Sequence, residues 1–231
     1  MSAGLLGVIA TVVCLGALAA LVAAEVRRDR AGRFRWKPLA SIAFVAIPLL
    51  TGALGADGRA GEVAAWVTAG LVLGAIGDVL LMFEAERAFL GGLASFLLGH
   101  LAYAVAFARI VPPGRWGEGG MLGVLAAALV AAALVLRWLW PKLGAMRGPV
   151  IGYVTVITAM VLGGVAVSVH SDAVDPTAPI LATAGAIAFY ASDLAVAREK
   201  FVVKDVWNRA IGLPLYYGAQ LLIAWSVAYR P

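Results

Sequence analysis

The chain has very few of the residues that build disulfide frameworks and transition-metal sites. Its 231 residues include one cysteine, Cys14, and two histidines, His100 and His170. A single cysteine excludes an intramolecular disulfide and a cluster of thiolate ligands. Two histidines exclude a three-histidine zinc centre. We therefore expect a protein with no bound metal, and no motif predicts a cofactor.

Charged residues are also scarce. They make up 13% of the chain against 63% hydrophobic residues, and the mean hydropathy is +0.95. This composition excludes an ordinary soluble domain and is typical of a polytopic membrane protein. A helix needs about 20 apolar residues to cross the bilayer. Eight segments reach or approach that length, at about residues 2–24, 37–53, 62–82, 88–110, 120–140, 150–169, 178–197 and 211–229.

We predict an all-α membrane protein with eight transmembrane helices in one bundle, and a single domain over residues 1–231, because the connections are short. Fourteen of the 18 basic residues fall in the connections after the first, third, fifth and seventh segments. Cytoplasmic loops are enriched in Lys and Arg, so both termini are expected on the non-cytoplasmic side. The membrane expected by default is a bacterial inner membrane. The basic residues counted on that side are Arg59, Arg109, Arg115 and Arg230.

The net charge of +5 is explained by this orientation. No set of stacking aromatic residues accompanies it, so we expect membrane lipid as the surroundings and no nucleic-acid partner.

Two aspartates, Asp78 and Asp193, lie inside otherwise apolar segments. An acid at the centre of a membrane helix costs about 2.5–3.5 kcal/mol on insertion scales. Each lies about four residues, or roughly 6 Å, from the predicted cytoplasmic end of its helix. We therefore predict that both acids occupy one layer of the cytoplasmic half and serve a function.

Polar side chains on other predicted helices supplement the two acids. Lys37 precedes Pro38 at the predicted start of the second helix, where an ammonium and free backbone amides suit a phosphate group. Taken singly, such residues also serve as interhelical hydrogen-bonding groups or as snorkelling charges. The further candidates are His100, Tyr103, Tyr190, Tyr217 and Gln220.

Two acids in a low-dielectric pocket can hold different protonation states, which provides an acid and a base at neutral pH. A proton-coupled transporter uses membrane acids as well, although no clear internal repeat is present. An aspartyl intramembrane protease is disfavoured, because Ala75 stands where its first motif begins with glycine and no Pro-Ala-Leu occurs in the eighth segment.

Five motifs follow one another along the chain: the Lys-Pro pair at 37–38, GAIGDVLLMF (74–83), FLGGLASFLLGHLAYAVAF (89–107), AIAFYASDLAVAREKF (186–201) and PLYYGAQLLIA (214–224). On these motifs the sequence resembles the YhhN family over nearly its whole length. The family includes eight-helix lysoplasmalogenases. The resemblance implies hydrolysis of the vinyl ether bond of a lysoplasmalogen, which yields a fatty aldehyde and glycerophosphocholine or glycerophosphoethanolamine.

The resemblance also implies that Asp78 and Asp193 are the essential acids, with Lys37, His100, Tyr190, Tyr217 and Gln220 as pocket residues. Vinyl ether hydrolysis needs a proton donor to the β-carbon and a carboxylate that stabilises the resulting cation and activates water. Our hypothesis gives the donor role to Asp193, the base role to Asp78 and the substrate phosphate to Lys37. A lysolipid-binding protein without turnover stays open as an alternative.

Overall fold

The computed structural model describes residues 2–172 and 175–229, which fold as helices joined by short connections. Within that part of the chain, eight helices are long and apolar enough to cross a membrane, which confirms the predicted fold class. Arg230, counted in the charge asymmetry, lies outside the described residues. The helices are α1 Ala3–Val26, α2 Arg30–Leu50, α3 Gly58–Leu80, α4 Glu86–Ile110, α5 Met121–Leu139, α6 Arg147–His170, α7 Thr177–Ala197 and α8 Val206–Ala228.

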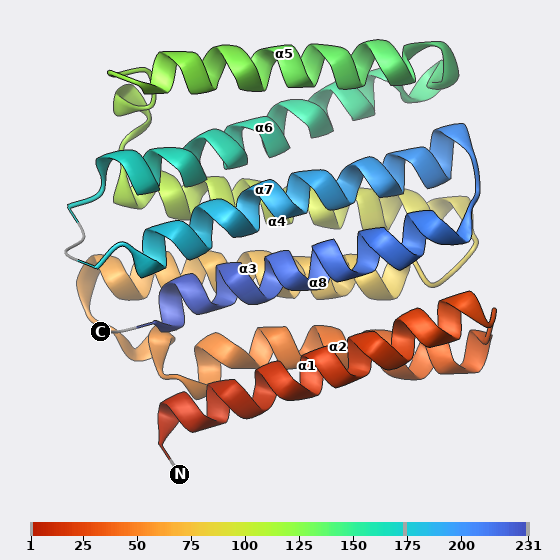
Figure 1. Cartoon of the computed structure of the whole chain (residues 1–231), viewed down its shortest axis with the longest axis horizontal. Helices are drawn as coiled ribbons and strands as arrows, with labels where there is room; N and C mark the ends of the chain where they lie inside the picture. Colours follow the sequence, from red (N-terminus) through yellow and green to blue (C-terminus); the bar gives the residue numbers. More distant parts are fainter. Residues whose placement is uncertain (1, 173–174, 230–231) are drawn as a thin grey trace.

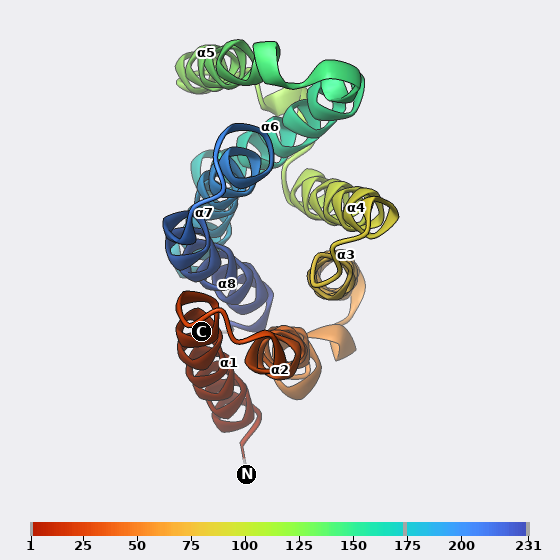
Figure 2. The ribbon, with the colours of Figure 1, turned by 90° about the vertical axis from the view of Figure 1, so that its right-hand side faces the viewer.

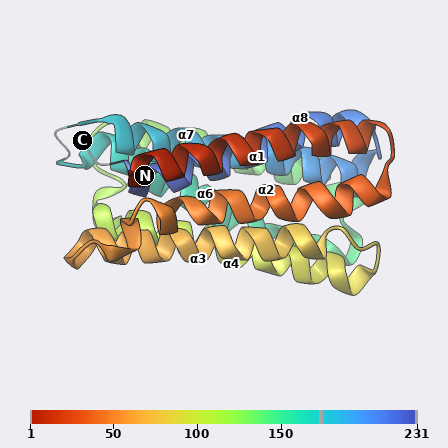
Figure 3. The same ribbon diagram turned by 90° about the horizontal axis from the view of Figure 1, so that it is seen from below.

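Successive helices run in opposite directions along one bundle, as Figures 1 and 3 show. The pairs α1–α2, α3–α4 and α7–α8 pack closely, whereas α5 packs mainly on α6 at the outer edge (Figure 2). The odd-numbered helices end, and the even-numbered ones begin, at the same end of the bundle. We call it the charged end, because it carries the connections with most of the basic residues.

Helix α2 begins earlier than the predicted second segment. Asp29 caps it by accepting a hydrogen bond from the Gly32 amide at 3.0 Å, and the helix starts at Arg30. The basic stretch before Lys37 is therefore helical, and Pro38 lies inside the helix. The expectation that Lys37 stands beside free amides at a helix start is wrong, because the helix begins two turns earlier, where the Gly32 amide binds the Asp29 carboxylate.

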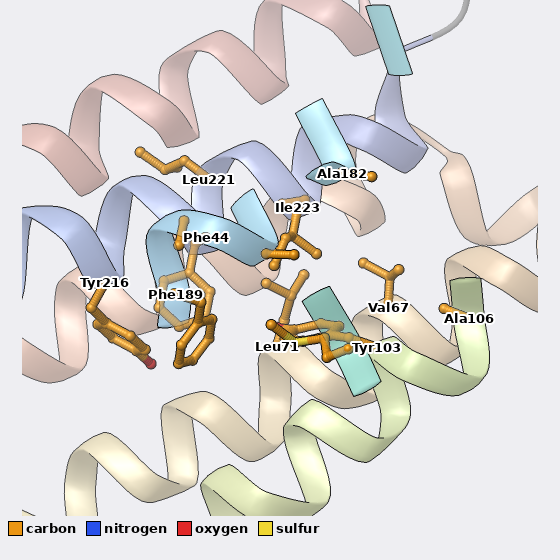
Figure 4. Close-up of a cluster of buried hydrophobic side chains, with 14 of the residues drawn as sticks. Phe44, Val67, Leu71, Tyr103, Ala106, Ala182, Phe189, Tyr216, Leu221 and Ile223 are labelled. Atoms are coloured by element: carbon orange, nitrogen blue, oxygen red, sulfur yellow. The ribbon is translucent and has the colours of Figure 1, made fainter. Parts of the chain in front are cut away.

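Buried aromatic and aliphatic side chains from most of the helices form one core. Phe44, Leu71, Tyr103, Phe189 and Ile223 are all at most 2% exposed. They come from α2, α3, α4, α7 and α8 in turn, and Figure 4 shows their side chains together. In a membrane, close packing of such groups has to stabilise helix association, because lipid tails are as apolar as the side chains.

The glycines of α3 make room for large side chains of α4 and α8. Gly70 faces the ring of Tyr103, Gly74 faces Gln220, and Gly77 faces the ring of Phe96. These contacts bring polar side chains of α4 and α8 against α3 one to two turns from Asp78.

We expect the Gly70→Ala substitution to destabilise the protein by about 1–3 kcal/mol. The added methyl group would overlap the Tyr103 ring and push its hydroxyl away from Gln220, to which it donates a 2.6 Å hydrogen bond. Gly16→Ala is the matched control, since its Cβ meets open space. Thermal unfolding in detergent should show a lower midpoint for the first variant alone; equal midpoints would contradict this packing.

A network of charged side chains links the helices at the charged end of the bundle. The buried Glu25 of α1 pairs with Arg33 of α2 at 2.9 Å and with Arg209 of α8 at 2.8 Å. Arg209 also pairs at 3.0 Å with Glu199, in the π-helical turn Arg198–Val202 that follows α7. The network therefore fixes the ends of α1, α2, α7 and α8 relative to one another.

Candidate functional site

Asp78 occupies a buried cluster formed by α2, α3 and α8. Its Oδ1 lies 3.2 Å from the Lys37 ammonium. Its Oδ2 lies 2.7 Å from the Ser41 hydroxyl and 3.3 Å from the Tyr217 hydroxyl, both of which donate to it. Asp78 is only 2% exposed. One cation and two hydroxyl donors are the surroundings of an ionised carboxylate.

Lys37 reaches this cluster from the interior of α2. The Lys37 carbonyl lies 3.0 Å from the Ser41 hydroxyl and 3.3 Å from that of Tyr217. Backbone and side chain of Lys37 thus both belong to the Asp78 cluster, and its ammonium charge is compensated there.

Asp193 occupies a second cluster with different chemistry, formed by α4, α6 and α7. The Tyr153 hydroxyl donates to its Oδ2 at 2.7 Å, and His100 Nε2 lies 3.7 Å from the same oxygen. The adjacent Ser192 hydroxyl donates to the Phe189 carbonyl at 2.8 Å and lies 3.5 Å from Oδ1. In the described part of the chain, no Lys or Arg side chain pairs with Asp193. Its side chain is 17% exposed, against 3% for Asp78.

The His100 ring is held by aromatic contacts. It meets Phe189 edge-to-face at 4.4 Å and Tyr153 at 5.3 Å between ring centres. It is fully buried, and neither ring nitrogen has a hydrogen-bond partner among the described residues. Buried ring nitrogens without partners are uncommon, and one of these, Nε2, lies beside the Asp193 carboxyl group.

An aromatic layer separates the two clusters. The Tyr216 ring contacts Phe189 at 5.3 Å on one side and Tyr217 at 4.9 Å on the other. Tyr216 and Phe189 lie together in Figure 4. Gln220 joins this layer: it accepts from Tyr103 at 2.6 Å and donates to the Tyr216 hydroxyl at 3.1 Å.

The structure thus distributes the predicted residues over three connected groups. Lys37 and Tyr217 lie with Asp78, His100 lies with Asp193, and Tyr103 and Gln220 belong to the layer between them. No hydrogen bond or ion pair within residues 2–172 and 175–229 joins one aspartate directly to the other. Tyr190 is half-buried one turn before Asp193, with its hydroxyl near Thr158, and does not contact the carboxyl group by hydrogen bonding.

The sequence profile of the YhhN family matches residues 32–227, and so includes every one of these residues. The chain belongs to the YhhN family. This confirms the resemblance carried by the motifs around Lys37, Asp78, His100, Asp193 and Gln220.

Named relatives support the same grouping. The chain is 34% identical over 158 residues to lysoplasmalogenase TMEM86A of Bos taurus, an alignment that covers 68% of this chain and 62% of that protein. It is 34% identical over 167 residues to a lysoplasmalogenase of Mycobacterium tuberculosis, covering 68% of this chain and 58% of the relative. The chain thus spans about six-tenths of the length of these relatives. No solved structure matches it.

Several residues that contact the clusters were absent from the candidates drawn from the sequence, among them Ser41, Tyr153 and Tyr216. Ser41 follows Lys37 by one helical turn, so a search for polar residues at i+4 would have found it. Tyr153 is the single tyrosine of the predicted helix 150–169, and Tyr216 is the neighbour of Tyr217 in the sequence. Their partners lie on other helices, and sequence spacing within one helix does not predict those contacts.

The two clusters provide complementary chemical groups at the same end of one bundle. The Asp78 cluster is ionic, with its carboxylate paired to an ammonium. The Asp193 cluster holds a carboxyl group among an imidazole and a phenol, without a paired cation. Such a difference in surroundings is what allows two carboxyl groups to act as acid and base in one reaction.

Proposed function

We propose that this protein hydrolyses the vinyl ether bond of lysoplasmalogens, to a fatty aldehyde and glycerophosphocholine or glycerophosphoethanolamine. The observation that carries the proposal is the contrast between the cation-paired Asp78 and the unpaired Asp193. Family membership and relatives named lysoplasmalogenase support it. On the charge asymmetry of the connections, we assign the site to the cytoplasmic half of a bacterial inner membrane.

In the proposed reaction, the Asp193 carboxyl group donates its proton to the β-carbon of the vinyl ether. The carbon bonded to oxygen becomes an oxocarbenium ion. Water adds to that carbon and gives up a proton to the Asp78 carboxylate. The resulting hemiacetal collapses as its hydroxyl proton passes to the departing glycerol oxygen, which yields aldehyde and alcohol. The proton held by Asp78 then returns to Asp193 through water, which restores both groups for the next turnover. We assign the proton donor to Asp193 because no Lys or Arg of the described residues pairs with it, whereas Asp78 is paired with Lys37.

The aromatic layer has a role in this mechanism. The oxocarbenium ion forms between the two clusters, where Phe189 and Tyr216 lie. Ring faces attract cations by about 0.5–2 kcal/mol, more when water is excluded. Tyr153 and His100 hold the Asp193 carboxyl group in position. Tyr103, Tyr190, Tyr217 and Gln220 orient substrate oxygens and water.

Aldehyde release by the purified protein tests the activity directly. We expect release in detergent micelles from lysoplasmenyl-choline or lysoplasmenyl-ethanolamine. The matched 1-O-alkyl lysolipids have no double bond to protonate and should release none. Turnover without a membrane gradient also separates a hydrolase from a proton-coupled transporter. Folded protein that releases no aldehyde from either vinyl ether would refute the proposal.

A further inference from the structure

A groove lies on the outer surface of the bundle, between α5, α7 and α8 at the charged end. Its volume is about 430 Å³, within the range of about 300–1,000 Å³ typical of small-molecule sites. Helix α5 packs mainly on α6, at the edge of the bundle (Figure 2). The residues that carry the argument are Leu134 and Trp138 of α5, Leu194 of α7, Trp207 and Ile211 of α8, and Arg198.

The walls of this groove suit an acyl-like chain. Leu134, Trp138, Trp207 and Ile211 are between 40% and 64% exposed, which in a membrane protein means that they face lipid. The two tryptophans lie at the charged end, the level at which amphipathic rings meet the headgroups. The groove therefore offers apolar surface along the helices and ends at the membrane–water boundary.

One end of the groove carries a positive charge that no acid of the described residues neutralises. Arg198 donates to the Asn208 side-chain oxygen, a neutral acceptor. The nearby carboxylates are engaged elsewhere: Glu199 binds Arg209 and the Asn208 amide, and Glu25 binds Arg33 and Arg209. Within the described residues, no ion pair includes Arg198. A guanidinium in this state suits a phosphate, which it can bind through two parallel hydrogen bonds.

We infer that this groove is the docking site of a single-chain lysophospholipid, with its phosphate on Arg198 and its chain between α5 and α7. The inference rests on the proposed function and deepens it, since it gives the substrate a place outside the bundle. Leu194, which lines the groove, directly follows Asp193. Because Lys37 is paired with Asp78, Arg198 replaces it as the phosphate-binding residue.

Tryptophan quenching by a lipid that cannot be hydrolysed tests the docking site separately from catalysis. The probe is a 1-O-alkyl lysophosphocholine with a brominated chain, titrated into the protein in nanodiscs. We expect saturable quenching, much of which disappears in Trp207→Phe but persists in Trp66→Phe, since Trp66 is on α3 and not in the groove. Equal quenching by a brominated diacyl phosphatidylcholine would show a general lipid contact and overturn the inference.

Separate variants test the contact between Arg198 and the phosphate. Because the Arg198 side chain would lose a charge-assisted hydrogen bond to the phosphate, Arg198→Gln should weaken binding about 10- to 100-fold. Arg137→Gln is the control, because this exposed arginine of α5 is at the same end but does not line the groove. Leu134→Trp, at a 59% exposed position, should weaken binding by filling the groove even if Arg198→Gln fails to fold.

The outcomes separate this inference from the proposed function. An unchanged affinity in both Arg198→Gln and Leu134→Trp would refute the groove, even if aldehyde is released. Saturable binding that these variants weaken, in a protein that releases no aldehyde, would retain the groove and refute the hydrolase.

Discussion

Replacing Asp193 with asparagine is expected to lower kcat for aldehyde release by about 10²- to 10⁴-fold, the usual contribution of a general acid. Asparagine has nearly the same shape, and its side-chain oxygen can still accept the hydrogen bond from Tyr153. It has no acidic proton to give to the β-carbon, however. The loss should therefore appear in kcat while the protein stays folded and still binds the alkyl lysolipid.

Asp172→Asn is the matched control for this variant, because Asp172 is an exposed acid outside the membrane helices. It should keep the wild-type rate. Single-turnover kinetics with saturating lysoplasmenyl-choline would separate the chemical step from binding. A wild-type rate for Asp193→Asn would remove Asp193 from the role of proton donor.

The sequence predicted the eight helices well, because hydropathy over about 20 residues reports directly on membrane insertion. The start of α2 was predicted less well. Residues 30–36 are rich in arginine and resemble a connection, yet Asp29 caps a helix there and the basic side chains project from its first turns. Pro38 is also compatible with the first turn of a helix that starts at residue 37. Only the Asp29 cap shows that the helix starts at Arg30 instead.

The contacts between helices were beyond a single sequence. The equal spacing of Asp78 and Asp193 from their helix ends predicted a common depth, and both acids do lie near the charged end. It gave no information on rotation about each helix, which turns one carboxyl group toward Lys37 and the other toward Tyr153. The aromatic layer between them depends on that rotation.

The pairing of Lys37 with Asp78 leads to the second large effect. Lys37→Met should destabilise the protein by about 3–5 kcal/mol, because it leaves the Asp78 carboxylate buried without its cation. Lys142→Met, at an exposed position of the charged end, should have little effect. The measurement is chemical or thermal unfolding of both variants in the same detergent.

Adding Asp78→Asn to Lys37→Met should restore most of this stability, because the double variant buries no unpaired charge. It should not restore aldehyde release, since the amide cannot accept the proton of the attacking water. A coupling free energy of several kcal/mol between positions 37 and 78 would then measure the strength of the ion pair. The absence of turnover would support Asp78 as the base. If Lys37→Met were as stable as wild type, Asp78 would not be an ionised partner of Lys37, and the contrast between the two acids on which the mechanism depends would be lost.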